Sequence, residues 1–130
     1  MSKINKKIVS SAALLGAITI ALGAFGAHGL KELLNEQTID SFNTGVRYQM
    51  YHTLALLIVG LSSRITDSTK KWFFRLMILG ILLFSGSIYA LSLKELLSVS
   101  NLSIGFITPL GGILLILGWL RLAFGIFVNK

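Results

Sequence analysis

Polar and aromatic side chains gather between residues 44 and 57, immediately before a wholly apolar stretch of the chain. On a helix, Tyr48 and His52 are four residues apart and therefore lie on one face, with Gln49 beside them. Histidine titrates near neutral pH, and its imidazole is a common metal ligand. A group of this kind can bind a ligand, relay a proton or hold neighbouring helices together by hydrogen bonds.

Few other residues could add chemistry to this group. The chain has no cysteine, and its two histidines, His28 and His52, have no third ligand at a metal-binding spacing. It contains no zinc-protease, nucleotide-binding or nucleophile-elbow motif, and the glycines of "GAFGAHG" follow no predicted strand. No acidic residue lies in the middle of an apolar stretch, which argues against proton-coupled export. We therefore expect neither an enzyme nor a bound metal or cofactor.

The composition of the chain is that of a membrane protein. Only 13% of its residues are charged and 54% are hydrophobic, whereas a soluble domain carries about 25% charged residues. The net charge of +7 does not indicate a nucleic-acid partner, because the basic residues lie between long apolar runs and not on one soluble patch. With 130 residues, the chain is expected to form a single integral membrane domain, residues 1–130.

The charged residues divide the chain into four apolar stretches, and about 20 apolar residues are needed to cross a membrane. The uncharged window from residue 48 to 63 is too short, so its helix should begin near residues 41–45 with Arg47 at the interface. The sequence thus predicts an all-α membrane fold, a bundle of four transmembrane helices. The expected spans are residues 8–28, 43–63, 73–93 and 103–124.

The connection between the first two spans has a pattern of its own. Leu30, Leu33 and Leu34 have helix-like spacing, and Thr38 could cap the helix that follows. We therefore expect a short amphipathic helix on the external surface between spans one and two.

The orientation follows from the Lys and Arg residues that flank the spans. Nine lie in the N-terminal segment, the second connection and the C-terminus, and three lie in the first and third connections. The nine are Lys3, Lys6, Lys7, Arg64, Lys70, Lys71, Arg75, Arg121 and Lys130, and the three are Lys31, Arg47 and Lys94. This bias predicts that both the N-terminus and the C-terminus lie in the cytoplasm.

Small residues within the spans are expected to pack the helices, because close backbone approach holds helices together in lipid. Ser87 and Pro109 could instead border a cavity, since proline removes one backbone hydrogen bond. The glycines expected to pack are Gly16, Gly23, Gly86, Gly111, Gly112 and Gly118.

Four stretches, one in each span, resemble a known family. They are "ALGAFGAHGL", "TGVRYQMYHTLALL", "LFSGSIYAL" and "TPLGGILLILGW". Together they are similar to the YgdD/YwdK family of small four-helix bacterial membrane proteins of unknown function. The resemblance covers nearly the whole chain in order. It implies four helices that cross the bacterial plasma membrane, and it assigns no residue a catalytic role.

The predicted topology brings polar groups from all four spans to one depth near the external interface. This expected layer consists of His28, Tyr48, Gln49, His52, Ser87, Tyr89 and Thr108. One interpretation is that it locks the helices in register, and the other is that it binds a ligand or a proton.

Two functions remain open from the sequence. The first is a structural or interaction component of the membrane. The alternative is a small-solute, ion or lipid-handling protein that uses the external layer. The expected partners are membrane lipids, and other membrane proteins or copies of the same chain for the first function.

Overall fold

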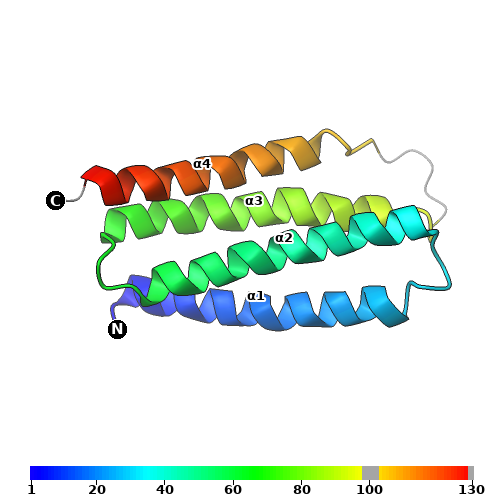
Figure 1. The fold of residues 1–130 in the computed structure, drawn as a ribbon, viewed down its shortest axis with the longest axis horizontal. Helices are drawn as coiled ribbons and strands as arrows, with labels where there is room; N and C mark the ends of the chain where they lie inside the picture. Colours follow the sequence, from blue (N-terminus) through cyan, green and yellow to red (C-terminus); the bar gives the residue numbers. More distant parts are fainter. Residues whose placement is uncertain (98–102, 129–130) are drawn as a thin grey trace.

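The computed structural model describes residues 1–97 and 103–128, and within these ranges the chain forms helices and turns, with no strand. The helices lie side by side along their lengths (Figure 1). Helix α1 begins, and α4 ends, at the end of the molecule that also holds the α2–α3 connection, called the terminal end below (Figure 1). The opposite end is called the distal end. The helices are α1 (Lys3–His28), α2 (Glu36–Leu61), α3 (Asp67–Leu93) and α4 (Ile107–Val128).

Three helices begin at a polar capping side chain. Ser2, Asn35 and Thr66 each accept a hydrogen bond from the backbone N–H three residues later. These bonds satisfy N–H groups that the first turn of a helix leaves without a partner. The cap of α2 is therefore Asn35, and the expectation that Thr38 is the cap is wrong: the Thr38 N–H is the donor to Asn35 Oδ1, at 2.9 Å.

The separate amphipathic helix expected between the first two spans is not found. Residues 29–35 form turns, and α2 begins directly at Glu36. Leu30 is fully buried and its N–H donates to the Phe25 carbonyl, whereas Leu33 is 63% exposed. The apolar spacing in this segment thus reflects one leucine that anchors a turn, and not one face of a helix.

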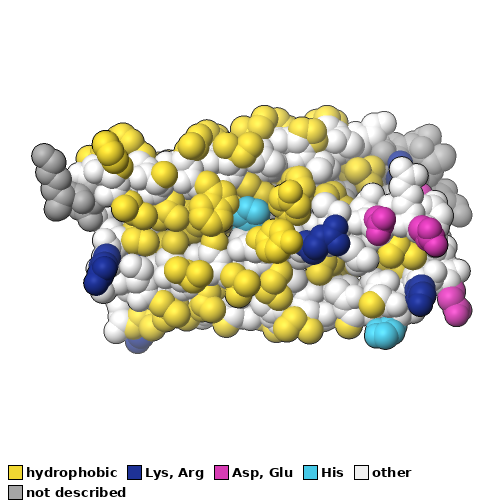
Figure 2. All heavy atoms as spheres, in the orientation of Figure 1, with side chains coloured by type: hydrophobic (Ala, Val, Ile, Leu, Met, Phe, Trp, Pro, Cys, Tyr) yellow, Lys and Arg dark blue, Asp and Glu magenta, His cyan; other side chains and the backbone are white. Residues whose placement is uncertain are grey.

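By length and composition, α1, α3 and α4 could each cross a membrane. Helix α2 has the same 26 residues as α1 but contains Glu36, Asp40 and Arg47, and it does not meet the same criterion. Hydrophobic side chains cover the middle of the face in Figure 2, and acidic side chains gather at the distal end. The middle of this face is therefore largely apolar, apart from a histidine and a basic side chain, and the acidic groups lie at the distal end.

The helices pack in chain order, with α2 between α1 and α3, and α4 against α3. The closest backbone approach lies between α3 and α4. A Cβ atom on Gly111 would overlap the Phe84 backbone nitrogen, and one on Gly118 would lie 2.6 Å from Met77 Cε. Leu115 similarly occupies the space beside Gly80.

The other glycines expected to pack differ in how closely they do so. A Cβ on Gly16 would meet Thr53 at 3.9 Å, and one on Gly23 would meet Val46 at 3.4 Å, so both face α2. Gly112 lies loosely beside Phe84, and Gly86 has no atom within 4 Å of its Cβ position. The packing role expected for Gly86 is therefore not seen in this chain. Four glycines outside the predicted set make closer contacts than Gly16, Gly23 and Gly112 do. They are Gly26, Gly45, Gly60 and Gly80.

The terminal end is held together by a buried lysine. Lys70 is 2% exposed, and its ammonium donates to Asn5 Oδ1 at 2.8 Å and to the Ser62 carbonyl at 2.5 Å. Ser62 is the C-cap of α2, where a helix carries partial negative charge. One side chain thereby joins the start of α1, the end of α2 and the start of α3.

Candidate functional site

Helices α2 and α3 are joined by two polar contacts in the middle of the molecule. Tyr89 donates from its hydroxyl to Gln49 Oε1 at 2.7 Å, and Ser85 donates to the Gly45 carbonyl at 2.7 Å. Gln49 is 4% exposed and Ser85 is 1% exposed. A Cβ on Gly45 would lie 2.9 Å from the Tyr89 ring, so this glycine leaves room for the tyrosine.

His52 faces α4. Its Nδ1 lies 2.6 Å from the Tyr48 carbonyl, and because a carbonyl only accepts hydrogen bonds, Nδ1 carries the proton. The imidazole stacks on Tyr48 and contacts the edge of Trp119, with ring centroids 6.1 Å apart in each case. His52 is 6% exposed. It therefore belongs to an aromatic contact that joins α2 to α4.

Ser87 and Thr108 join α3 to α4 at the level of the α2–α3 contacts, since Ser87 lies between Ser85 and Tyr89 on α3. Their hydroxyls are hydrogen-bonded to each other, and Ser87 Oγ also lies 3.0 Å from the Phe84 carbonyl. Since that carbonyl must accept from Ser87, Thr108 is the donor between the two hydroxyls. Ser87 is 5% exposed. Ser87 and Thr108 both belong to the predicted layer, and the structure places them in contact.

The structure does not place all seven predicted layer residues at one depth. His28 is exposed at the distal end of α1, where nearby Gly26 packs against Phe42 of α2. His52 neighbours Thr53, which faces Gly16 of α1. Gly16 and His28 are about 18 Å apart along α1 at 1.5 Å per residue. The two histidines therefore lie at different levels of the molecule.

The register between α1 and α2 sets this separation, because Gly26 packs against Phe42 and Gly16 lies beside Thr53. Phe42 and His52 are ten residues apart, about 15 Å along α2. A span that began at residue 43 would also place His52 about 14 Å from its start, so the beginning of α2 at Glu36 does not cause the separation. The layer is thus divided into an exposed His28 and a central group that joins α2, α3 and α4 and includes Gln49, His52 and the Ser87–Thr108 pair.

The outward face of α2 carries polar and aromatic groups near the middle of the helix. Tyr48 is 41% exposed and Tyr51 is 56% exposed, with ring centroids 5.8 Å apart. Arg47 is also exposed, and its guanidinium donates to Thr44 Oγ1 at 3.0 Å. The Arg47 side chain thus extends toward the distal end, as a snorkelling arginine does.

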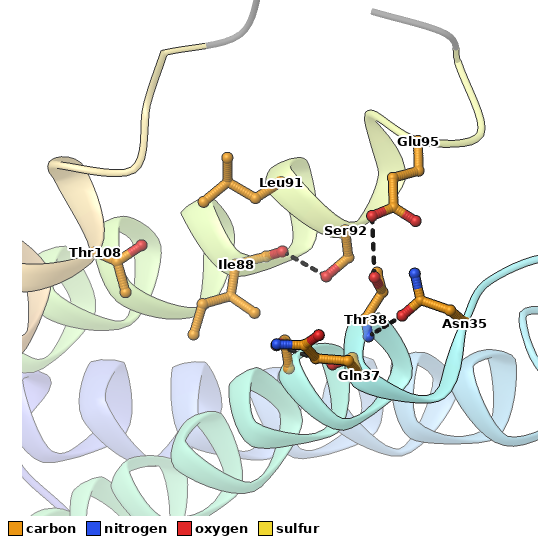
Figure 3. Close-up of a pocket in the computed structure, with 9 residues that line it drawn as sticks. Asn35, Gln37, Thr38, Ile88, Leu91, Ser92, Glu95 and Thr108 are labelled. Carbon is orange, nitrogen blue, oxygen red and sulfur yellow. Dashed lines mark hydrogen bonds between the residues drawn. The ribbon is translucent and has the colours of Figure 1, made fainter. Parts of the chain in front are cut away.

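A cavity of about 470 Å³ opens at the distal end between α2, α3 and the start of α4 (Figure 3). Glu95 is its one charged lining residue and accepts a hydrogen bond from the Thr38 hydroxyl at 3.0 Å. The other lining residues are Asn35, Gln37, Thr38, Ser41, Ile88, Leu91, Ser92 and Thr108.

Sequence reasoning selected only Thr108 from this set, although one signal was available. Gln37 and Ser41 are four residues apart on α2, and polar residues at this spacing form one polar strip on a helix. This strip at the start of α2 could have indicated the cavity.

Among residues 1–97 and 103–128, no three His, Cys, Asp or Glu side chains lie together in a way that could hold a metal ion. The buried side-chain polar atoms described there have hydrogen-bond partners, with Thr53 Oγ1 the exception. The central polar residues thus bond either to one another, as Tyr89 does to Gln49, or to backbone carbonyls, as Ser85 and His52 do.

Four packed helices, three of them long and apolar, and polar contacts between them define a small helical membrane protein. Residues 22–112 match the family described as "Protein of unknown function (DUF423)". The chain belongs to this family, and the resemblance found from its sequence is confirmed.

Relatives match along most of the chain. A UPF0382 membrane protein of Haemophilus influenzae is 41% identical, over 97% of this chain and 98% of its own. UPF0382 membrane protein YwdK of Bacillus subtilis is 43% identical, over 84% of this chain and 89% of its own. A UPF0382 membrane protein of Staphylococcus epidermidis is 40% identical, over 90% and 92%. No solved structure matches the chain.

Proposed function

We propose that this protein crosses the bacterial plasma membrane four times, with both termini in the cytoplasm. Helices α1, α3 and α4 are each apolar enough to cross the membrane. The remaining span would be α2, because it packs between α1 and α3. A helix held along its length between two spanning helices passes through the same layer of lipid. The basic residues of the terminal end support the orientation, although Lys130 of that set lies outside the described residues.

The orientation can be tested by labelling introduced cysteines, because the chain has none of its own. A thiol reagent that cannot cross the membrane is added to intact cells carrying Ser68→Cys or Glu32→Cys. Both residues are exposed, at the terminal and distal ends respectively. We expect labelling at position 32 alone, and labelling at position 68 alone would invert the proposed topology.

Within the membrane, we propose that the protein acts as a structural or interaction component. The observation that supports this is the hydrogen bond from the Tyr89 hydroxyl to Gln49 Oε1 at 2.7 Å. The bond joins two of the residues expected to form a polar site, and it uses the Tyr89 hydroxyl proton and the Gln49 carbonyl oxygen for a contact between helices. Such bonds between helices stabilise a membrane bundle by about 0.6 to 2 kcal/mol each.

The interaction would use the outward face of α2. Arg47, Tyr48 and Tyr51 are exposed along this face, and a charged or polar side chain within a membrane span usually faces protein or water and not lipid. A second membrane protein, or another copy of this chain, could cover them. This surface is separate from the buried Tyr89–Gln49 contact.

Two measurements test this function. Tyr89→Phe should lower the thermal stability in detergent without removing a bound small molecule, and loss of a ligand at unchanged stability would contradict it. A photo-crosslinking residue at position 51 should capture one discrete protein partner in the native membrane. The same residue at position 14, where Leu14 is exposed on α1, is the control.

The cavity in Figure 3 favours a second candidate, the handling of a small solute. Its volume of about 470 Å³ lies within the usual range for small-ligand sites, about 300 to 1,000 Å³. Glu95 would favour a cationic group. Native mass spectrometry of lipid-extracted protein should then detect a small bound molecule that Glu95→Gln loses and Glu32→Gln, outside the cavity, retains. Equal retention by both variants would count against this candidate.

A further inference from the structure

A second cavity, of about 240 Å³, lies at the terminal end between the start of α3 and the end of α4. It is far from the distal cavity and shares no residue with it. Its lining residues are Thr66, Ser68, Thr69, Arg121, Phe124, Gly125 and Val128.

Arg121 is the one charged residue that lines this cavity. Its NH1 group donates to Thr69 Oγ1 at 3.1 Å, and Thr69 is 2% exposed, so a buried hydroxyl positions the guanidinium. Thr66 also donates to Thr69 Oγ1, at 3.0 Å. A guanidinium has five N–H groups, so one bond to Thr69 leaves others to bind an anion. Asp67 is in the first turn of α3 but does not line the cavity.

The walls of the cavity differ in polarity. Arg121 and the hydroxyl residues Thr66, Ser68 and Thr69 make one wall polar. Phe124 is 63% exposed and Val128 is 56% exposed, and these apolar side chains form the other side. The Arg121 guanidinium bonds to Thr69, which lies two residues from the start of α3 at Asp67, so the charged group is held at the terminal end of the molecule.

We propose that this cavity binds the phosphodiester of an anionic phospholipid. The guanidinium and the hydroxyls would hold the phosphate oxygens, and Phe124 and Val128 would contact the first carbons of an acyl chain. Arginine is well suited to phosphate because its fork of N–H donors matches two oxygens. Basic pockets between helices on the cytoplasmic side of a membrane are known lipid head-group sites.

The size of the cavity restricts what it holds. A volume of about 240 Å³ is below the usual range for a drug-sized ligand. It can admit a phosphate and the neighbouring glycerol carbons, and the remainder of the lipid would lie along the outer surface of α4. The shared chemistry is a phosphoryl anion, and free inorganic phosphate is the other source that a test must separate.

The experiment uses the full chain in detergent, titrated with phosphatidylglycerol or phosphatidylcholine and followed by native mass spectrometry. Wild type should retain one phosphatidylglycerol in preference to phosphatidylcholine. Arg121→Gln should bind phosphatidylglycerol about tenfold more weakly, the effect of one charge-assisted hydrogen bond. Arg75→Gln is the matched control, because Arg75 is exposed on α3 and lies over Trp72, outside the cavity.

A second variant separates a loss of lipid binding from a loss of folding. Ser68→Asp adds a negative charge at the exposed rim of the cavity, and an acid in the first turn of a helix is stabilising. It should lower phosphatidylglycerol binding without lowering thermal stability. Equal binding by wild type, Arg121→Gln and Ser68→Asp would overturn the proposal. Displacement of phosphatidylglycerol by inorganic phosphate at equal concentration would also overturn it, because the site would then select free phosphate.

Discussion

The two contacts that α3 makes, with α2 on one side and α4 on the other, are built in different ways. Toward α2, α3 uses hydrogen bonds from Ser85 and Tyr89. Toward α4, it depends on glycines that allow the backbones to approach, with Gly111 against the Phe84 backbone and Gly118 against Met77. One helix therefore combines directional polar contacts toward α2 with close van der Waals packing toward α4, where the Ser87–Thr108 hydrogen bond adds to the packing.

The difference predicts how each contact responds to substitution. A lost hydrogen bond between membrane helices costs about 0.6 to 2 kcal/mol, because the separated groups can find other partners in the unfolded state. A side chain forced between two backbones cannot be accommodated without moving a helix, and overpacking costs about 1 to 3 kcal/mol or more. We expect the α3–α4 contact to be less tolerant than the α2–α3 contact.

The largest effect is expected for Gly111→Leu. The new side chain would overlap the Phe84 backbone, so we predict a loss of about 3 kcal/mol or failure to fold, measured by thermal unfolding in detergent. Gly86→Ala is the control, since nothing lies within 4 Å of its Cβ position, and it should change stability little. Equal effects at both positions would show that close approach does not hold α4 in place.

The second largest effect is expected for the hydrogen bond that joins α3 to α2. Tyr89→Phe and Gln49→Leu should each destabilise the protein by about 1 kcal/mol, because each removes one partner of their hydrogen bond. The double variant should cost less than the sum of the two, and unfolding measurements on all four proteins give the coupling. Strict additivity would mean that the bond does not contribute to stability.

A smaller effect is expected for Ser87→Ala, which removes a polar contact from the α3–α4 side. The Thr108 hydroxyl loses its partner, but Thr108 is only half-buried and can find water or its own backbone. We predict about 0.5 kcal/mol by the same unfolding measurement. A cost as large as that of Gly111→Leu would mean that polar contacts dominate on both sides.

The smallest effect is expected for His28→Ala. His28 is exposed and lies outside both contacts, so thermal stability should not change measurably. A clear loss of stability would contradict this prediction. It would mean that His28 makes a stabilising contact with α2, which its exposed position does not provide.

Some of this architecture follows directly from the sequence. Residues seven apart lie on the same face of a helix. The spacing of Gly111 and Gly118 was therefore sufficient to predict that both contact a neighbouring helix. The family was also evident from its motifs. The pairing of Ser87 with Thr108 agrees with their expected proximity.

Other features could not be obtained in this way, because they depend on how the helices are aligned. Hydropathy placed the start of the second span near residue 43, since Glu36 and Asp40 are charged, but the Asn35 cap begins α2 earlier. The register between α1 and α2 separates His28 from His52, because Gly26 meets Phe42 and Gly16 meets Thr53. The distal cavity likewise results from the arrangement of three helices, which no single segment encodes.

The burial of Lys70 has a consequence for how its charge acts before and after assembly. During insertion, its ammonium is free and adds to the basic segment that is retained on one side of the membrane. Once folded, the same ammonium is held by Asn5 and Ser62 and is shielded from water. An amine-reactive reagent should therefore modify neighbouring Lys71, which is exposed, and leave Lys70 unmodified until the helices separate.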